Sequence, residues 1–405
     1  MPLTSASSLI VTLLLVSACG AFQIHHNHVR LDRSGTSTGR HQGTLLHSQK
    51  SRPGSMEAAT AELGSVPYGE ASRQYRRTVY THEDWILHRS EDRLVYNLKG
   101  LFFSGVVRQL KKEIGLITTV AVLVVGWNDL LVQAMPMIPH LCLPMTPFTL
   151  SSPALGLLLV FRTNTSYQRW LEGRNRWGVI IAQSRNIVRM ASTFADTSSK
   201  AGRKAIDDLS QIVWILSRTI MNRLSGPNDD AAYEKELREV CKDDDSLILR
   251  LLSAPDRASA ALMEASMVLD DIPVDEKRRV EIDKSLVVIG DAMSVTDRIF
   301  TSPVPLVYTR HTARFLSVWM LLLPFAIHDE FLKADASGLP TIPASAFLSL
   351  FLFGIEELAV QLEEPFSILP MQRYCDEIRE VGNRMIDWNV QSRKERTKKS
   401  VPNGI

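Results

Sequence analysis

The sequence predicts an all-α membrane protein, with four membrane-spanning helices and a large helical domain outside the bilayer. Four windows of the 405-residue chain are nearly free of charge, although 22% of all residues are charged. The region between the second and third windows carries apolar residues at helical spacing, and no strand pattern of note is present. A chain of this length can form one membrane unit with a soluble part.

The four apolar windows predict helices that cross a bilayer. The first two predicted spans cover about 114–134 and 148–170, and the last two cover about 305–327 and 342–362. About 20 residues are needed for a helix to cross ~30 Å of hydrocarbon. The uncharged parts of the third and fourth windows are short, so alone they would also fit buried helices of a soluble domain. Their pairing with the first two favours the membrane.

The second window also predicts where its helix begins. Ser151 or Ser152 is expected to cap the helix, because serine side chains accept hydrogen bonds from free first-turn amides. Pro153 then falls in the first turn, where no amide donor is needed. The N-terminus of a helix near Ser152 would present a partial positive charge and free amides.

The central region, 173–301, is expected to be helical. One helix is predicted from the apolar spacing between Ile206 and Ile220, and two more are predicted over 229–252 and 274–300. Breaks are expected at Gly226-Pro227, at Pro255 and at Pro273, since these residues interrupt helices.

The distribution of basic residues predicts a topology. Residues 135–147 contain no Lys or Arg, and 328–341 contain only Lys333. The flanking regions on the other side of each span are rich in Lys and Arg. By the positive-inside rule, the N-terminal segment, the central region and the C-terminus lie on one side of the membrane.

The N-terminal residues are expected to be a targeting address. Residues 1–21 fit a signal peptide with a short apolar core, and 22–65 have the acid-poor, Ser-, Thr- and Arg-rich composition of a plastid transit peptide. Residues 17–22 resemble the Ala-Phe cleavage motif of algae with complex plastids, which predicts a plastid membrane protein. A lipoprotein signal at Cys19 and simple secretion are the alternatives.

Several function classes are disfavoured. The net charge of +2 gives no argument for nucleic acid. The four cysteines form no CxxC pair, and the chain lacks phosphate-loop, dinucleotide, zinc-protease and nucleophile-elbow motifs, so neither a metal nor an enzyme is predicted. The histidines at 25, 26 and 28 are interpreted as transit sequence, and His82 and His328, each followed by acidic residues, as surface or interfacial side chains.

The second window resembles the signature of the bestrophin family. The resemblance rests on 147–150, 156–170, 172–174 and 177–178. Residues 305–309 and 364–366 are similar to two later motifs of that family, in the same order and spacing. The similarity makes 75–390 a bestrophin-like channel domain, followed by a basic tail at 391–405, and looks closest to the plant thylakoid branch of voltage-dependent chloride channels.

The resemblance implies a homopentamer around one central pore for small anions. Matching the motif places Pro153, Leu157 and Phe161 at the pore neck, and their spacing of four puts them on one helical face independently of the family. Without the family, Leu157 and Phe161 would be interpreted as lipid-facing or packing residues. A narrow apolar ring of this kind gates by excluding water.

Basic residues are candidates for attracting anions. Arg162, Arg169 and Arg176 recur every seven residues and share a face with each other. Pairing with Glu172 or with acids of a neighbouring subunit is the alternative. Ser152 is included because of the expected helix start, and the family's lower constriction would correspond to Lys277, Arg278 and Arg279.

The resemblance leaves the permeant anion open. A thylakoid chloride channel that balances proton-motive force is the leading hypothesis, a plastid bicarbonate channel is the second, and a non-conducting membrane scaffold is the third. Animal members follow the Pro-Phe motif with a run of acidic residues that binds calcium. Residues 367–371 hold no carboxylate, so no calcium clasp is expected.

Overall fold

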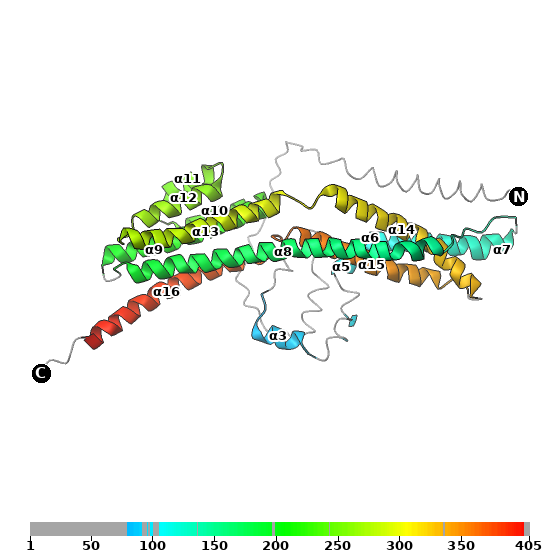
Figure 1. Ribbon diagram of the computed structural model, residues 1–405, viewed down its shortest axis with the longest axis horizontal. Coiled ribbons are helices and arrows are strands. Elements are labelled where there is room, and N and C mark those ends of the chain that lie inside the picture. The colour runs from blue at the N-terminus through cyan, green and yellow to red at the C-terminus, as the bar shows by residue number, and fades with distance from the viewer. Residues whose placement is uncertain are drawn as a thin grey trace, which may run out of the picture. The chain divides into compact units, whose positions relative to one another are not determined.

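The computed structural model describes residues 79–90, 95, 98–99, 105–135, 137–196, 199–242, 244–334 and 337–400, without the side chains of 397–400. All regular elements in these ranges are helices, as Figure 1 shows, which confirms the predicted all-α class. The predicted signal peptide 1–21, the predicted transit peptide 22–65 and the last residues of the tail, 401–405, lie outside the described residues. The rest of the expected tail is the end of the last helix.

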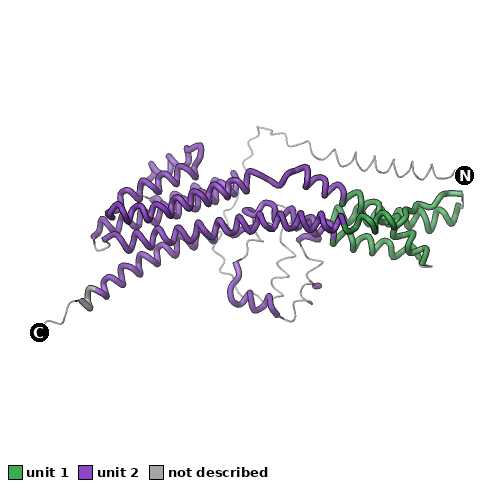
Figure 2. The backbone as a smooth tube through the Cα atoms, viewed as in Figure 1, with its two compact units in different colours: residues 1–65, 110–153, 316–351 green, residues 66–109, 154–315, 352–405 purple. Residues whose placement is uncertain are grey.

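The chain forms two compact units, coloured separately in Figure 2. Unit 1 contains 110–153 and 316–351, and unit 2 contains the described parts of 66–109, 154–315 and 352–405. Three helices continue from one unit into the other: α8 (Thr146–Phe194), α14 (Leu306–Lys333) and α15 (Thr341–Glu363).

Unit 1 contains the first predicted span and parts of the others. The span is α6 (Lys111–Val125), followed by the π-helix η2 (Gly126–Leu131) and the short α7 (Val132–Ala134). Val124, Leu141 and Phe325 form a small core of this unit. Phe148 packs edge-on against Trp319, whose indole nitrogen donates to the Ser151 hydroxyl at 3.0 Å.

Three helical stretches in the described part of the chain are long and apolar enough to cross a membrane. They are Lys111–Ala134, Leu306–Lys333 and Thr341–Glu363, close to the first, third and fourth predicted spans. The second predicted span lies in α8 and does not reach the same apolarity, because Pro153, the serines and Arg162 dilute the apolar run. Less than half of each apolar stretch is buried, as expected of surfaces that lipid or other subunits cover.

Unit 2 contains the predicted central domain. Its helices, besides parts of α8, α14 and α15, are α3 (His82–His88), α5 (Gly105–Gln109), α9 (Lys200–Ser225), η3 (Pro227–Asp229), α10 (Asp230–Val240), α11 (Asp245–Ser253), α12 (Arg257–Asp270), α13 (Glu276–Thr301) and α16 (Met371–Ser400). α9 is the central helix and packs against α10, α12, α13 and α16. Residues 212–222 are buried without interruption, because neighbours cover α9 on every side.

The predicted breaks in this region are confirmed, with one correction. α9 ends before Gly226, whose φ of 74° favours glycine. The single helix expected over 229–252 is wrong, since α10 and α11 are separate. Asp244 starts α11 by accepting a hydrogen bond from the Leu247 amide at 2.9 Å, and this bond holds the pKa of Asp244 below its usual range.

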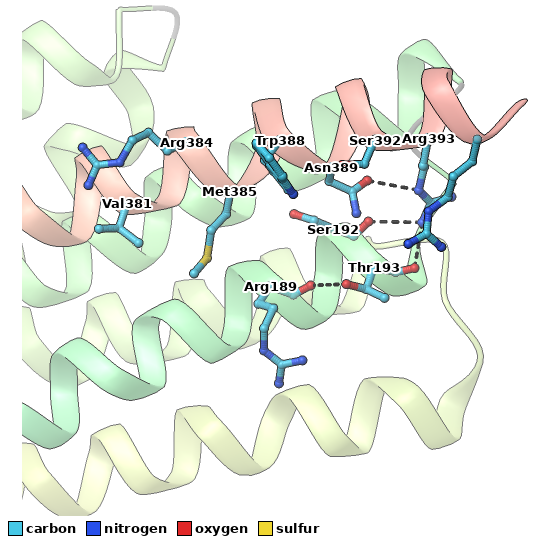
Figure 3. Close-up of a pocket in the computed structure, with 11 residues that line it drawn as sticks. Arg189, Ser192, Thr193, Val381, Arg384, Met385, Trp388, Asn389, Ser392 and Arg393 are labelled. Atoms are coloured by element: carbon cyan, nitrogen blue, oxygen red, sulfur yellow. Dashed lines mark hydrogen bonds between the residues drawn. The ribbon is translucent and has the colours of Figure 1, made fainter. Parts of the chain in front are cut away.

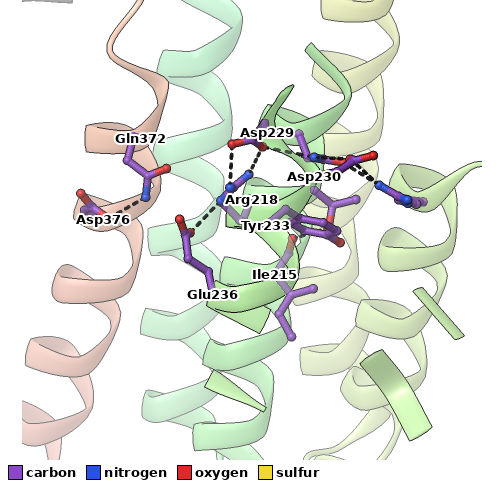
Figure 4. A network of polar contacts seen from close by, with 11 residues as sticks. Ile215, Arg218, Asp229, Asp230, Tyr233, Glu236, Gln372 and Asp376 are labelled. Atoms are coloured by element: carbon purple, nitrogen blue, oxygen red, sulfur yellow. Dashed lines mark hydrogen bonds and ion pairs between the residues drawn. The ribbon is translucent and has the colours of Figure 1, made fainter. Parts of the chain in front are cut away.

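A buried arginine joins α9 to the segment that follows it (Figure 4). Arg218 donates to both carboxylate oxygens of Asp229, at 2.7 and 3.0 Å, and to Glu236 at 2.8 Å. Its guanidinium also lies over the ring of Tyr233. Burial lowers the pKa of Arg218, but the hydrogen bonds to Asp229 and Glu236 outweigh that effect and raise it above its usual value. This arrangement fixes η3 and α10 on α9.

Candidate anion pathway along helix α8

α8 carries the predicted neck residues, and it begins earlier than expected. The helix starts at Thr146, so Pro153 lies inside it and Ser151 and Ser152 do not cap it. The expectation of a helix N-terminus near Ser152 is therefore wrong, and with it the stated reason for Ser152 as an anion-attracting residue. In the observed first turn Pro147 has no amide donor, and the amides of Phe148 and Thr149 both donate to the carbonyl of Met145, each at 3.0 Å.

Ser152 has a structural task in the helix instead. Pro153 has no N–H group, so the carbonyl of Thr149, four residues earlier, lacks its usual backbone donor. The Ser152 hydroxyl donates to that carbonyl at 3.1 Å. Ser151 donates in the same way to the carbonyl of Pro147 at 2.7 Å. Back-bonding of this kind lets α8 continue through Pro153.

The two large neck residues are exposed in the single chain. Leu157 and Phe161 are each 54% exposed, and Pro153 is exposed as well. Leu155 and Leu159, which point away from that face, are 2% exposed. One side of α8 thus packs inside the subunit, and the predicted neck face remains available to lipid, to a neighbouring subunit or to a pore.

Arg162 lies on the packed side of α8 and is paired within the chain. It is buried, it contacts Glu356 of α15 at 2.7 Å, and it donates to the carbonyl of Thr309 in α14 at 3.2 Å. A buried guanidinium held by a carboxylate and a carbonyl positions three helices relative to one another. The alternative of ion pairing is therefore the observed state, although the partner is neither Glu172 nor another subunit.

Arg169 holds the ends of two other helices. Its guanidinium donates to the carbonyls of Ile299 and Ser302 at the end of α13, at 2.7 and 2.9 Å. It also donates to the carbonyl of Glu363, the last residue of α15, at 2.9 Å. The last carbonyls of a helix lack intrahelical donors, and a cation there also complements the helix dipole. Arg169 is a capping residue for two helices that meet α8.

Replacing Arg169 with methionine is expected to destabilise the subunit by several kcal/mol, because hydrogen bonds to charged groups contribute about 1.5–3 kcal/mol each. Thermal unfolding of the detergent-solubilised protein would measure the change. Arg176→Met is the matched control, since Arg176 is one seven-residue repeat further along α8 and lines a surface pocket. Equal losses for the two variants would contradict the capping role.

Gly173 explains one position of the α8 signature. A Cβ atom at Gly173 would lie 3.0 Å from the Pro365 ring and 3.5 Å from Phe366, which is buried. The absence of a side chain allows α8 to approach the Pro-Phe turn. Glu364 closes that turn by accepting hydrogen bonds from the amides of Phe366 and Ser367 at 3.0 and 3.2 Å.

The predicted lower constriction lies at the start of α13. Arg278 pairs with Asp275 at 3.1 Å and lies over the ring of Phe194, and Arg279 pairs with Asp270 at 2.7 Å. Lys277 is exposed. Two of the three cations are thus neutralised by neighbouring carboxylates in the subunit.

A basic groove that the sequence did not predict lies between the end of α8 and α16 (Figure 3). It has a volume of about 840 Å³ and is lined by four arginines, Arg189, Arg384, Arg393 and Arg396, and none of the described residues that line it carries a carboxylate. Arg393 donates to the carbonyls of Ser192, Thr193 and Ala195, at 3.3, 2.7 and 3.2 Å. It caps the end of α8, which attaches α16 to that end.

A polar cluster in unit 1 was also missed. His328 is fully buried rather than at the surface, and its Nε2 atom lies 3.0 Å from Asp129. Its Nδ1 atom lies 3.4 Å from the amide nitrogen of Asn128. The signal was present in the sequence. Asn128 and Asp129 interrupt the first apolar window at the end where the third window reaches His328, so both predicted spans bring polar residues to one side.

Taken together, the helical fold and the apolar spans define a multi-pass α-helical membrane protein whose second window forms the long helix α8. Comparison with known proteins gives the family. The family described as bacterial and fungal bestrophin proteins matches residues 84–382. The chain belongs to the bestrophin family. The expectation that it is not an enzyme is confirmed, since the family consists of channels.

Relatives in plants are similar to this chain over most of its length. Voltage-dependent chloride channels 1 and 2, chloroplastic, of Arabidopsis thaliana are 33% and 31% identical over 312 and 310 residues, covering 76% of this chain and 72% of each relative. A voltage-dependent anion channel-forming protein of Nostoc is 28% identical over 253 residues, covering 60% of this chain and 77% of the relative.

Solved structures support the same fold. A crystal structure of a bacterial bestrophin homologue from Klebsiella pneumoniae superposes with a TM-score of 0.58 at 20% identity, covering 68% of this chain and 97% of the homologue. The chloroplast names of the plant relatives and the apolar spans support a plastid membrane protein.

Proposed function

We propose that this chain is a subunit of an anion channel in a plastid membrane, with Pro153, Leu157 and Phe161 of α8 at the pore neck. The observation that carries the proposal is the exposure of Leu157 and Phe161 on a helix whose opposite side is packed inside the subunit. The names of the plant and bacterial relatives, which are chloride or anion channels, support the same reading.

The neck would act through its size and apolarity. Several copies of Leu157 and Phe161 around an axis form a narrow ring from which water is easily excluded. An anion that passes must lose part of its hydration shell. Weakly hydrated anions lose less, so permeability is expected to rise from chloride toward nitrate and iodide.

We further propose a homopentamer in the thylakoid membrane, with passive chloride flux that offsets proton pumping and with the voltage dependence that the relatives' names state. The basic regions around the spans favour the stromal side for unit 2 by the positive-inside rule. Arg162 and Arg169 are assigned to holding α8 in place. Arg176 and Lys277 remain as proposed anion-attracting groups, because neither is buried.

Bilayer recordings of the purified protein would test the channel function. Chloride on one side and bicarbonate on the other give a reversal potential that reports which anion is preferred. A chloride current supports the leading hypothesis, and a dominant bicarbonate current would assign the alternative. If protein of confirmed fold gave no current with either anion, the remaining hypothesis would be the non-conducting membrane scaffold.

Calcium is not proposed as a trigger. The carboxylate of Glu364 is engaged with the amides of its own turn, and residues 367–371 supply no further carboxylate. Calcium sites use six to eight oxygen ligands, usually with Asp or Glu among them. Isothermal titration is expected to give no calcium-binding heat at this turn, and currents are expected to be the same with calcium or with a chelator. Calcium-activated current abolished by Glu364→Gln would refute this.

A further inference from the structure

The polar cluster around His328 has a fixed arrangement of donors and acceptors. The Asn128 side chain accepts a hydrogen bond from the Leu141 amide at 2.8 Å and donates to the Leu141 carbonyl at 2.9 Å. These two hydrogen bonds to one backbone residue determine which end of the side-chain amide is nitrogen. Asn128 therefore presents an N–H group, and not an oxygen, to Nδ1 of His328.

The protonation state of His328 follows from that orientation. Facing a donor, Nδ1 of His328 must be the acceptor and carries no proton. The proton of the neutral ring is then on Nε2, where it is donated to the Asp129 carboxylate at 3.0 Å. The backbone of Gly338 closes over this pair, because a Cβ atom there would collide with both His328 and Asp129.

Of the two ring nitrogens of His328, only Nδ1 can take up a further proton. Protonated Nδ1 would place an N–H group against the N–H group of Asn128, so the two must separate. Asn128 cannot turn its oxygen to the ring without breaking both bonds to Leu141. A proton on Nδ1 of His328 is thus incompatible with the present contact between the ring and the Asn128 side chain that holds Leu141.

The charges around the ring are few. On η2 the charged neighbour is Asp129, which stays hydrogen-bonded to Nε2 in both states. On α14 itself, Asp329 and Glu330 are paired with Lys333 at 2.6 and 2.9 Å. In 137–145 the titratable residues are His140 and Cys142, and 338–345 contains none. The described surroundings therefore attract a proton through Asp129 and oppose it through Asn128.

We propose that His328 is a proton-binding site whose occupation releases Leu141, in the segment 137–145, from Asn128 of η2, while the indole of Trp127 still donates to the Pro139 carbonyl at 3.1 Å. This segment leads directly into α8 at Thr146. Acid on that side of the membrane loosens the anchor at the start of the helix that carries the neck. Release of Leu141 from Asn128 does not depend on the proposed channel function. Only the expected effect of this release on anion current rests on the proposed channel function.

A spin label on Cys142 reports release without any need for transport. Cys142 is exposed, one residue beyond Leu141, whereas Cys241 and Cys375 are buried, and Cys19→Ser removes the remaining thiol. Desolvation raises the pKa of the Cys142 thiol, so the full-length protein is labelled first and the pH is varied afterwards. Spectra are compared at a mildly alkaline and at a mildly acidic pH.

The parent is expected to show a more mobile label at the lower pH. His328→Gln keeps a donor for Asp129 and an acceptor for Asn128 but cannot bind the proton, so its label is expected to stay immobile at both values. Asn128→Ala removes the anchor, so its label is expected to be mobile at both values. His140→Gln is the control and should retain the step of the parent.

The proposal is overturned by a parent without a step, by a step that persists in His328→Gln or Asn128→Ala, or by a step that disappears in His140→Gln. If His328→Gln does not fold, Asn128→Ala still decides. Anion current is the second readout. A current that differs between the two pH values in the parent but not in His328→Gln supports the link to α8. A change in label mobility without any anion current would support the proton site and contradict the proposed channel function.

Discussion

Phe161→Ala is expected to raise anion flux by about tenfold, which corresponds to a barrier lower by about 1.4 kcal/mol. Truncation widens an apolar ring and lets water and the hydrated anion enter it. The variant should fold normally, because Phe161 is largely exposed in the subunit and its loss opens no core cavity. Flux is measured in vesicles or as single-channel conductance, and Leu157→Ala is expected to change it in the same direction.

Val160→Ala is the matched control for this prediction. Val160 is the neighbour of Phe161 in α8 and is exposed to the same extent, 54%, but it points about 100° away around the helix. It is expected to leave flux unchanged. Equal flux in the parent and in both neck variants would indicate that this face meets lipid, and would contradict the assignment of the pore neck to α8.

Arg218→Ala is expected to destabilise unit 2 by about 3–5 kcal/mol, the usual effect of removing one partner from a buried ion pair. Arg218 is fully buried, and its loss leaves Asp229 and Glu236 partly buried without their cation. Thermal unfolding in detergent, followed by circular dichroism, would show a lower midpoint. Anion selectivity in the remaining folded fraction should not change.

Arg238→Ala separates the effect of burial from the loss of any arginine. Arg238 pairs with Glu234 on the surface of α10, at 2.8 Å and four residues away. Exposed pairs of this spacing contribute about 0.3–0.5 kcal/mol. A loss for Arg238→Ala as large as that for Arg218→Ala would show that the Arg218 network is not the stabilising feature.

Much of the fold could be predicted because its signals are local in the sequence. Apolar runs located both ends of α15 and the start of α14 to within one residue, and Gly226 marked the end of α9. Local rules failed where two residues compensate one another. Pro153 indicated a helix start, but the hydroxyl of Ser152 supplies the donor that Pro153 lacks.

The site was less accessible to sequence reasoning, since its partners are distant along the chain. The spacing of Arg162 and Arg169 suggested a shared charged face. The partners of Arg169 are backbone carbonyls more than 100 residues away, and a carbonyl has no signature in the sequence. The family match supplied the neck residues, which spacing alone would have assigned to packing.

The burial of α9 on all sides has a consequence for biosynthesis. Part of its cover is α16, where Gly382 approaches Ser210 so closely that a Cβ atom would lie 2.7 Å from the hydroxyl. α16 begins only at Met371, so more than 140 residues are synthesised after α9 before its cover is complete. A nascent chain, or one truncated before Met371, leaves exposed the side of α9 that α16 covers, and such apolar surface is recognised by chaperones and proteases.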